Sequence, residues 1–501
     1  MNRRIHRRDL LKFGAWAVSA GLIPASPGLA TGLPRREPIS LPSGKQQSVL
    51  IVGAGLSGLV AAYELRKLGH RVIVLEAQRR PGGRVYSVRA PFSDGLYAEV
   101  GAARIPDNHD LTLHYVREFN LPLTPFYPAT GSRMYSIGGK RIRADVSGEW
   151  IAGEAPLDLK RSEKKLGQWA LLEKYVGGAL AELGDPYKID YESVVARRFD
   201  SVTTAEYLRQ QGASEAANDL LSWPWSTAKD DRYSFLWTLR EIAYESQEKT
   251  RWKIVGGNDQ LPYAFAATMK DVIRYGSPVR RIEQDDKRVR AIVTMPGGPS
   301  ETFEADRLLC TVPFPVLRNM DLGRFSIRKE RVINELAYDT IVRATMQCRT
   351  RYWEHAGFNG FGHSDTPQQI WHFTHDQPGP RGLLVSFLCG GTGERVGDMQ
   401  PEYREQYLVA EMERAHPGFR NDYEGMFVHV WHKDAWAQGA FALPSPGQLT
   451  GLCVGAERPE GRIHFAGEHL SNFSGWMQGA FESGLRAVRE ISALSATSER
   501  P

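Results

Sequence analysis

Three glycines at fixed spacing, Gly53, Gly55 and Gly58, form a stretch that can bind the phosphates of a dinucleotide. The first permits a tight turn, the second lets the backbone approach a pyrophosphate, and the third lets a helix pack on a strand. Glu76 ends the next apolar run, where a carboxylate accepts hydrogen bonds from an adenosine ribose. The spacing therefore predicts a dinucleotide site. The neighbours expected to contact the same group are Leu56, Ser57 and Ala77.

A second glycine-rich run follows, with the sequence Arg80-Pro81-Gly82-Gly83-Arg84 directly after Leu75-Glu76-Ala77. Its glycines allow the backbone to pass close to a cofactor, and Arg84 is able to neutralise a phosphate. This run resembles the one that the flavin-containing amine oxidases have directly after their first β-α-β unit. The resemblance implies FAD as the cofactor rather than a nicotinamide dinucleotide.

The resemblance extends over roughly residues 46–495. Further matching segments are Ile254-Val255-Gly256-Gly257 with Leu261-Pro262, Ala305-Asp306 through Thr311-Val312-Pro313, and Arg462 through Glu468. It implies one FAD-binding domain built from three separated segments, 46–85, 250–325 and 455–495. Additional cofactor contacts implied by the resemblance are those of Gly83, Gly101, Ala102, Ala103, Arg104, Val279, Gly467, Glu468 and Met477.

The segment from Glu468 to Gly475 ends a predicted strand and begins a predicted helix. A carboxylate at Glu468 is able to accept hydrogen bonds from ribityl or phosphate-side hydroxyls. A helix that begins near Gly475 directs its N-terminus at the flavin pyrimidine, where it stabilises the anionic reduced flavin. No cysteine lies within residues 469–478, where some monoamine oxidases form a covalent link, so we expect FAD to bind non-covalently.

Arg104 is the residue that most informs the choice of substrate. A planar guanidinium neutralises an α-carboxylate through two parallel hydrogen bonds, whereas an enzyme for simple amines needs no cation at this place. The stretch from Gly101 to Pro106 resembles the G-x-x-R-x-P of the snake-venom-type L-amino acid oxidases, where the arginine holds the substrate carboxylate above the flavin. The alternative is that Arg104 pairs with a protein carboxylate or a phosphate.

The same group has a Gly-Trp pair that resembles Gly475-Trp476. There the glycine carbonyl receives the substrate amine and the tryptophan forms a wall of the pocket. Phe441 falls where the group places a side-chain pocket residue, although plain packing in the protein core remains an alternative for Phe441 and Trp476. The other candidate pocket residues are His372, Phe373 and Trp436.

Two positions depart from that group. Arg343 falls where the group usually has a lysine that holds a water near flavin N5, and an arginine is bulkier and does not lose its proton. Reaction with dioxygen is thereby in question, and a dehydrogenase that uses another acceptor is an alternative. The group also has a tyrosine that assists the carboxylate clamp. The matching stretch, Ile370-Trp371-His372-Phe373, has none, and His372 is the substitute donor.

Regular elements must position these residues. Residues 48–52 and 71–75 are continuous apolar runs, typical of strands buried in a parallel sheet, and between them lies a helix from Leu56 to about Leu68 that Gly69 ends. Thr203 and Glu206 have the spacing of a capping box, and Gly212 is placed to end that helix. Further expected elements are a helical pattern over 160–183, a meander of strands at 289–293, 301–305 and 308–312, an antiparallel sheet within 330–450, a strand at 463–466 and a helix over 475–492.

The predicted fold class is α/β: a Rossmann-like FAD-binding domain of the glutathione-reductase or amine-oxidase type, a mixed-sheet substrate domain and a helical insertion. The substrate domain is assigned to 86–145 and 326–454, and the helical subdomain to 146–249. A chain of 501 residues suits two or three such domains.

Charge and cysteine usage exclude several classes of function. The net charge is +5, but residues 1–30 contain five Arg and Lys against one Asp, which leaves about +1 (5 − 4) for the rest, so no basic nucleic-acid-binding face is indicated. The four cysteines have no metal-site spacing, and no metal is expected. No nucleophile-elbow, P-loop or H-E-x-x-H motif is present.

The first 30 residues resemble a twin-arginine export signal. Arg7-Arg8 precede Leu10-Leu11-Lys12, then comes a short apolar stretch and a small-residue end at Ala30. We therefore expect the twin-arginine machinery as a partner and a periplasmic or secreted location in a bacterium. An amphipathic anchor is the alternative, although the apolar stretch is too short to span a membrane.

Together these features predict an FAD-dependent L-amino acid oxidase. Hydride transfer from Cα to flavin N5 would give the 2-oxo acid, ammonia and, with dioxygen as acceptor, hydrogen peroxide. The alternatives are a monoamine or polyamine oxidase without carboxylate recognition, an amino-acid dehydrogenase or monooxygenase, and a flavoprotein without turnover. The preferred side chain and the existence of a homodimer are left open.

Overall fold

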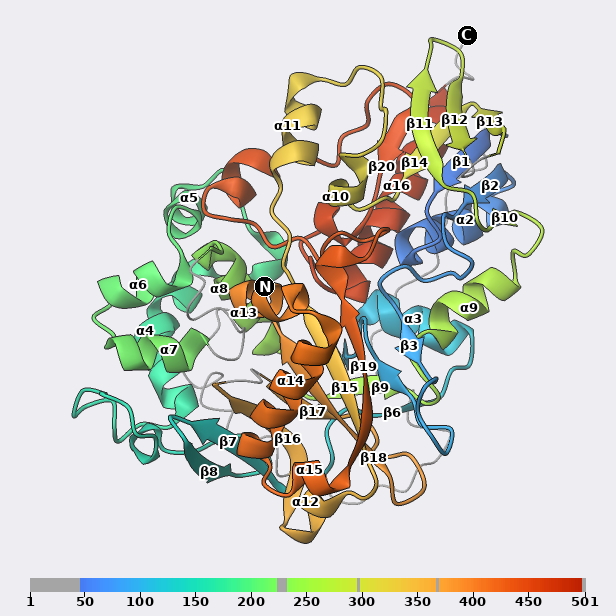
Figure 1. Cartoon of the computed structure of the whole chain (residues 1–501). Helices are drawn as coiled ribbons and strands as arrows, with labels where there is room; N and C mark the ends of the chain where they lie inside the picture. The colour runs from blue at the N-terminus through green and yellow to red at the C-terminus, as the bar shows by residue number, and fades with distance from the viewer. Residues whose placement is uncertain (1–45, 223–231, 295–297, 366–368, 498–501) are drawn as a thin grey trace.

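The computed structural model describes residues 46–222, 232–294, 298–365 and 369–497. The predicted export signal at residues 1–30 lies outside this part of the chain. Figure 1 shows a parallel sheet with its helices at the upper right, a large sheet in the lower middle, and the helices of residues 168–245 at the left. The predicted α/β class is confirmed by this arrangement. No helix in the described part of the chain has the length and apolarity needed to cross a membrane.

The parallel sheet contains five strands in the order β10-β2-β1-β14-β20, and every neighbouring pair is parallel. Strands from the start, middle and end of the chain thus form one sheet. Its strands are β1 (Ser48–Val52), β2 (Arg71–Leu75), β10 (Ile273–Arg274), β14 (Arg307–Cys310) and β20 (Ile463–Phe465). The strands expected at 48–52, 71–75 and 463–466 are confirmed.

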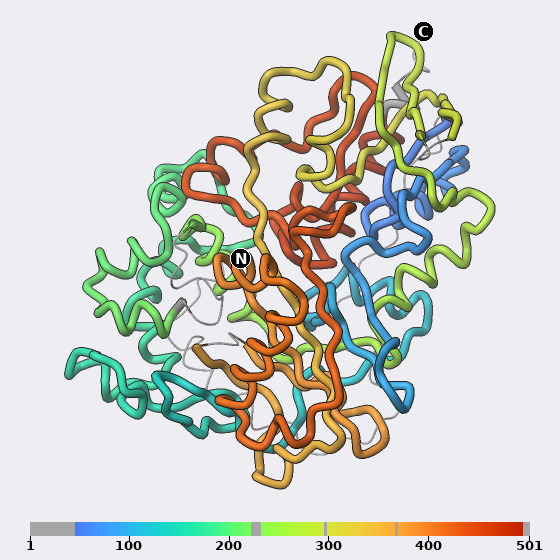
Figure 2. Tube along the Cα trace, viewed as in Figure 1, coloured from blue at the N-terminus to red at the C-terminus, as the bar shows by residue number. Residues whose placement is uncertain are grey.

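Two long helices pack together beside this sheet, α2 (Leu56–Lys67) and α16 (Met477–Thr497). Gly69 has a φ of +87°, a left-handed conformation that suits the predicted end of α2. In Figure 2 the red C-terminal segment runs beside the blue segment that begins the described chain. Gly484 allows this packing, because a Cβ there would lie 2.6 Å from the carbonyl oxygen of Ser57. The third glycine of the loop instead lets α2 begin close to β1, because a Cβ at Gly58 would lie 2.1 Å from the carbonyl oxygen of Gly53.

The predicted meander needs one correction. Its three strands are β11 (Val279–Gln284), β12 (Val289–Thr294) and β13 (Ser300–Ala305), all antiparallel. The run expected as its last strand, 308–312, is instead β14 of the parallel sheet. The physical reason is that Leu308, Leu309 and Cys310 are all buried, which is typical of a strand covered on both faces, whereas β12 alternates buried and half-buried residues.

A mixed sheet of seven strands has the order β19-β15-β18-β17-β16-β7-β8. All pairs are antiparallel except β7 with β16, which is parallel. The strands are β7 (Ser132–Ile137), β8 (Lys140–Ala144), β15 (Val342–Cys348), β16 (Phe358–Ser364), β17 (Gln369–His372), β18 (Gly382–Leu388) and β19 (Tyr423–Val430). The sheet is therefore built from the two segments assigned to the substrate domain.

The helices α13 (Gly390–Asp398) and α14 (Pro401–Ala415) lie along this sheet in Figure 1. Val342, Ala344 and Met346 of β15 join the apolar cluster of α14, so the intervening Arg343 belongs to the opposite face. That opposite face includes Trp371 and Phe387. Strand alternation thus decides which side chains of the large sheet turn away from α14.

The helical segment contains α4 (Gln168–Leu183), α5 (Val194–Asp200), α6 (Thr204–Gln210), α7 (Glu215–Ser222) and α8 (Phe235–Glu245). The helix expected over 160–183 begins only at Gln168. The capping box at the start of α6 is confirmed, because Thr203 Oγ1 accepts from Glu206 N at 3.2 Å and Thr203 N donates to the Glu206 carboxylate at 2.9 Å. Gly212 follows α6 with a φ of +79°.

A small sheet of β5 (Ile105–Pro106), β9 (Arg251–Ile254) and β6 (Leu123–Pro125) joins residues near 250 to the segment 86–145. The helix α3 (Asp110–Glu118) lies between β5 and β6 in sequence. The remaining elements are β3 (Ser87–Val88), β4 (Ala98–Glu99), α9 (Gln260–Ala267), α10 (Phe314–Leu317), α11 (Ile327–Glu335), α12 (Tyr352–His355) and α15 (Phe419–Asp422).

Candidate active site

One large cavity, of about 3010 Å³, is bounded by the parallel sheet, the seven-stranded sheet and the helical segment. The predicted site residues that line it are Gly53, Gly55, Leu56, Ser57, Glu76, Ala77, Gly83, Arg84, Gly101, Ala102, Ala103, Arg104, Val279, Arg343, Trp436, Phe441, Gly467, Glu468, Gly475, Trp476 and Met477. Gly58, His372 and Phe373 do not line it. The structure thus brings together residues more than 400 positions apart in sequence.

The glycine loop after β1 leaves open space toward the cavity. Gly53 has a φ of +106°, and a Cβ there would lie 2.6 Å from the hydroxyl oxygen of Thr311. A Cβ at Gly55 would meet nothing within 4 Å, although Gly55 lines the cavity. This space beside a helix N-terminus has the form that a pyrophosphate needs. The loop therefore fits a dinucleotide on its own geometry.

Glu76 lies at the end of β2 with both carboxylate oxygens bonded to the backbone. Its Oε2 accepts from Ala54 N at 2.6 Å and its Oε1 accepts from Gln78 N at 2.8 Å. Burial raises the pKa of this carboxyl, although these backbone N–H donors oppose the rise. A carboxylate oxygen accepts more than one hydrogen bond, so Glu76 retains capacity for ribose hydroxyls.

Arg84 has a protein partner in place of the phosphate that the sequence suggested. Its Nη1 donates to Glu468 Oε1 at 2.8 Å and to the carbonyl oxygen of Ala440 at 3.0 Å. Glu468 is 7% exposed and Arg84 is half-buried, and both line the cavity. The charge of Arg84 is thus compensated within the protein, and this ion pair joins the glycine-rich run to the segment after β20.

The turn before α16 is also fixed by Glu468. Its Oε2 accepts from Gly475 N at 2.7 Å and its Oε1 from Ala442 N at 3.2 Å. Gly475 has a φ of +84°, and a Cβ there would lie 3.3 Å from the ring of Phe441. The left-handed φ favours glycine here, and the short approach to the Phe441 ring adds to that preference. The helix begins two residues later at Met477, so its N-terminus faces the cavity.

Arg104 lies between two tryptophans on the cavity wall. Its guanidinium carbon is 5.1 Å from the ring centroid of Trp371 and 5.4 Å from that of Trp476. Among the described residues, its side chain makes no hydrogen bond and no ion pair. The alternative of a protein carboxylate as partner is therefore not realised there. A half-buried guanidinium whose donors contact no carboxylate of the described chain is suited to an anionic ligand group, and Glu248 acts on it only through charge attraction at longer range.

Arg343 points from β15 toward the same tryptophan. Its guanidinium carbon lies 5.0 Å from the Trp371 ring and 4.8 Å from the Phe387 ring, and its Nη1 donates to the carbonyl oxygen of Glu99 at 3.0 Å. Burial and the neighbouring Arg104 lower the pKa of Arg343 to about 9. Arg343 is therefore still cationic at neutral pH. Its buried Nε has no partner in the described chain.

The predicted pocket roles of His372 and Phe373 are corrected by the structure. Trp371 lines the cavity, and the next residue of β17 must point to the opposite face of the sheet. His372 accordingly packs edge-on against Trp353, with Nε2 3.0 Å from Thr374 Oγ1 and Nδ1 3.2 Å from the carbonyl oxygen of Asn359. Burial lowers its pKa well below the usual value, so it is neutral.

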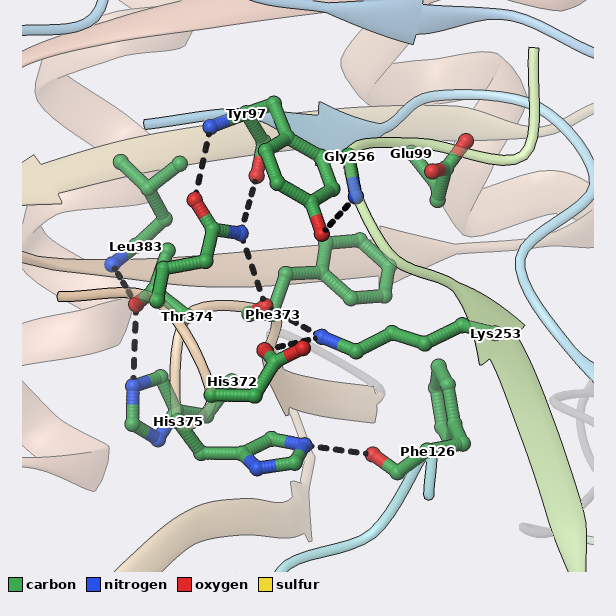
Figure 3. A network of polar contacts seen from close by, with 12 residues as sticks. Tyr97, Glu99, Phe126, Lys253, Gly256, His372, Phe373, Thr374, His375 and Leu383 are labelled. Carbon is green, nitrogen blue, oxygen red and sulfur yellow. Dashed lines mark hydrogen bonds and ion pairs between the residues drawn. The ribbon is translucent and has the colours of Figure 1, made fainter. Parts of the chain in front are cut away.

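Figure 3 shows what occupies the place behind Phe373. Lys253 Nζ donates to the carbonyl oxygen of Phe373 at 2.7 Å and to Asp376 Oδ1 at 2.6 Å. The ring of Phe373 packs against those of Phe126 and Trp371 in the core. This network fixes the backbone after β17 rather than presenting Phe373 to the cavity. Period-two alternation along the strand was the sequence signal for the correction at His372. It gives no signal for Phe373, which follows the strand and shares an apolar cluster with Trp371.

Trp436 and Phe441 line different parts of the cavity. The Trp436 ring lies 5.4 Å from the guanidinium carbon of Arg280, the residue after Val279, which is a predicted cofactor contact. Phe441 instead lies against Gly475 and stacks on Trp237, with ring centroids 6.4 Å apart. Phe441 is thus near the predicted amine position. Trp436 lines the cavity beside Arg280, and its pocket role stays a prediction.

Several cavity residues were missed at the sequence level. Tyr127 follows β6, and although its burial raises its pKa, Arg251, Arg104 and Arg133 outweigh that effect and lower it. The guanidinium of Arg251 is held by Glu245 and Glu248, each at 2.6 Å. No sequence spacing predicts that these residues meet, because Tyr127 lies in a loop, Glu245 at a helix end and Arg251 in a strand. Trp237 and Glu241 of α8 were missed for the same reason.

The family model described as flavin-containing amine oxidoreductase matches residues 56–492. The chain belongs to this family. A putative L-amino-acid oxidase of Bacillus subtilis is 31% identical over 460 residues, covering 89% of this chain and 95% of the relative. A flavin-dependent L-tryptophan oxidase of Lentzea aerocolonigenes is 31% identical over 479 residues, covering 89% and 98%. An L-amino-acid oxidase of the snake Naja atra is 27% identical over 456 residues, covering 89% and 88%.

Solved structures support the fold. A triple mutant of putrescine oxidase superposes with a TM-score of 0.78 at 22% identity, covering 90% of this chain and 99% of the other. Cyclohexylamine oxidase from Brevibacterium oxydans IH-35A superposes with a TM-score of 0.75 at 20% identity, again over 90% and 99%. At this identity the likeness concerns the fold alone.

As a member of this family, the protein is a flavoprotein oxidoreductase that acts on CH–NH₂ groups, and its cofactor is FAD. The open space at Gly55, the carboxylate of Glu76 and the helix N-terminus at Met477 are the features that fit this cofactor. All four cysteines are free thiols. Cys453 is half-buried and the other three are buried.

Proposed function

We propose that the enzyme oxidises L-α-amino acids to 2-oxo acids and ammonia. The observation that carries this proposal is the free guanidinium of Arg104 between Trp371 and Trp476. Such a cation supports substrates with a carboxylate next to the amine, because its N–H donors are available for two parallel hydrogen bonds to a planar anion. The similarity to L-amino acid oxidases of a bacterium and a snake points the same way.

In this proposal the chain acts mainly by positioning. Arg104 binds the carboxylate through two parallel hydrogen bonds, and the carbonyl oxygen of Gly475 accepts from the substrate amine. Phe441 and Trp237 form an apolar wall beside that amine. Non-covalently bound FAD supplies the electron acceptor and dioxygen reoxidises it to give hydrogen peroxide. The imino acid then leaves and is hydrolysed by water.

Tyr127 supplies a hydroxyl that the sequence could not locate. It lines the cavity, and Arg104 is one of the three arginines that lower its pKa. A donor with a lowered pKa near the carboxylate site favours the bound anion. We therefore assign to Tyr127 the assisting role that the sequence had left to His372.

The decisive experiment is an anaerobic titration of the yellow holoenzyme. Each of the twenty amino acids in its L form, the D forms, and decarboxylated analogues such as tryptamine are added while the flavin absorbance is followed. The proposal expects bleaching by L-amino acids and not by the amines, with 2-oxo acid and peroxide formed once air is admitted. Bleaching by the amines alone would make the enzyme an amine oxidase without carboxylate recognition. No bleaching by any of them would mean a flavoprotein without this activity.

We also propose that residues 1–30 direct the folded protein through the twin-arginine pathway to the periplasm or the exterior. The paired Arg7 and Arg8 before the apolar stretch support this. Replacement of both by lysine in the native host is expected to retain the enzyme in the cytoplasm, as cell fractionation measures. Unchanged export of that variant contradicts the proposal.

A further inference from the structure

One face of α8 is bonded to the turn that contains Gly475 and Trp476. Trp237 Nε1 donates to Ser474 Oγ at 2.9 Å, Arg240 Nη2 donates to the same oxygen at 3.1 Å, and Trp476 Nε1 donates to Glu241 Oε2 at 2.7 Å. Positions 237, 240 and 241 share one helix face. The helical segment therefore holds the turn at residues 474–476 through these side-chain bonds. Glu468, which follows the parallel sheet, holds the same turn through its bond to Gly475 N.

We propose that Glu241 is a positioning residue of the active site: its carboxylate fixes the Trp476 indole so that Arg104 and Gly475 keep the spacing that the substrate needs. This inference rests on the proposed function, since it concerns the carboxylate and amine subsites assigned there. Glu241 is 2% exposed and lines the cavity wall behind the indole. A buried indole N–H requires an acceptor, and Glu241 is the acceptor that the structure gives it.

Arg240 offsets part of the cost of burying Glu241, although burial still raises the pKa of Glu241 to about 7. Arg240 Nε lies 4.0 Å from Glu241 Oε1, and both side chains are almost fully buried. Arg240 Nη1 also donates to the hydroxyl of Tyr191 at 2.9 Å, and this hydroxyl donates to Asn472 Oδ1 at 2.9 Å. The turn is thus held at positions 472, 474 and 476 by one connected network.

The indole of Trp476 is restrained on three sides. Glu241 holds its N–H, the imidazole of His109 lies perpendicular to it with ring centroids 5.0 Å apart, and Arg104 lies 5.4 Å from its ring centroid. Of these three, only Glu241 makes a directed hydrogen bond to the ring. Loss of that bond frees the indole to rotate and changes the contact with Arg104 without removing either residue.

Four single variants and one double variant of the FAD-loaded enzyme test the proposal. Glu241→Leu removes the acceptor, and Glu241→Gln keeps a carbonyl oxygen that is able to accept from Trp476. Thr238→Val is the matched control: Thr238 is a buried residue of the same helix whose hydroxyl contacts Thr204 instead of the turn. Trp476→Phe, alone and combined with Glu241→Leu, completes a double-mutant cycle.

The readouts are KM and kcat for the best amino acid and the dissociation constant of benzoate, a non-reactive carboxylate, from its perturbation of the flavin spectrum. We expect Glu241→Leu to raise KM and the benzoate constant about tenfold while kcat changes less than about threefold, and Glu241→Gln to restore most of the loss. In the Trp476→Phe background the same leucine change should have less than about a twofold effect, because Glu241 acts through the indole.

Multiplicative effects in the cycle, or an equal loss in Thr238→Val, overturn the positioning role. The failure of the proposed function has a different signature: wild-type enzyme then shows no benzoate perturbation and no amino-acid turnover. In that case the double-mutant cycle is measured with the KM of the amine that bleaches the flavin. The expectation is unchanged: Glu241→Leu should have less than about a twofold effect in the Trp476→Phe background.

Discussion

Arg84 and Glu468 form a 2.8 Å ion pair across 384 residues of sequence. The pair closes the cavity wall where the segment after β2 meets the segment after β20. Glu468 also bonds the backbone of Ala442 and Gly475, so one carboxylate orders the cofactor side and the substrate side of the site together.

Glu468→Gln should weaken FAD binding. The neutral amide has a single acceptor oxygen for three protein donors, and the expected loss is about 1.5–3 kcal/mol, or roughly tenfold to a hundredfold in the dissociation constant. Quenching of FAD fluorescence on adding apoenzyme measures the change. Glu335→Gln is the control, because Glu335 forms an exposed ion pair with Arg331. An equal loss of FAD affinity in this control contradicts the role of Glu468.

Gly55 and Gly58 should respond differently to a side chain. Gly55→Val places methyl groups in open space on the cavity wall, so the apoprotein should retain its thermal midpoint but bind no FAD. Gly58→Ala places a methyl group 2.1 Å from the carbonyl oxygen of Gly53, and the apoprotein itself should be destabilised by about 1–3 kcal/mol. Thermal unfolding of both apoproteins decides this, and a stable Gly58→Ala apoprotein would show that the packing of α2 tolerates a Cβ.

Arg104→Ala should raise KM for amino acids by a factor equivalent to about 2–4 kcal/mol, because a half-buried charge pair with the substrate is lost. Arg104→Lys should restore part of the affinity, since an ammonium supplies the charge but not two parallel hydrogen bonds. Any turnover of a simple amine serves as the internal control and should be unaffected. A KM that rises equally for amine and amino acid would mean that Arg104 shapes the cavity rather than binding carboxylate.

Glu99 should make stability depend on pH. Burial raises its pKa to about 7, against the opposing effect of its bonds to Ser87 and Asn258. Because the folded-state pKa exceeds the unfolded one, the contribution is fully present below about pH 4.5 and is lost as the pH rises through 7, by about 3 kcal/mol in total. The thermal midpoint of the holoenzyme from pH 5 to 8 should fall less steeply in Glu99→Gln. Parallel slopes in the two proteins would falsify the assignment.

The parts of the fold that follow from local rules were predictable. The glycine loop, the apolar runs of β1 and β2 and the capping box at Thr203 each depend on a few adjacent residues. The assignment of 308–312 to the meander failed because a continuous apolar run was grouped with its sequence neighbours. Only the burial of both faces identifies it as part of the parallel sheet.

The candidate site was predictable where the family has a sequence pattern and not elsewhere. Arg104, Gly475 and Trp476 lie together as expected, whereas His372 turned out to face the other side of β17. Tyr127 and Glu241 could not be found, since their roles arise from which segments meet in three dimensions. The ion pair of Arg84 with Glu468 could not be predicted for the same reason.

The order of strands in the parallel sheet bears on how the protein is made. β20 is an edge strand, and Glu468 and Met477 follow it near the end of the described chain. A ribosome makes these residues after both earlier segments, so a nascent chain that contains only those segments still lacks one wall of its cofactor site. The complete flavin site therefore requires synthesis through the start of α16, and a chain truncated before β20 should accumulate colourless.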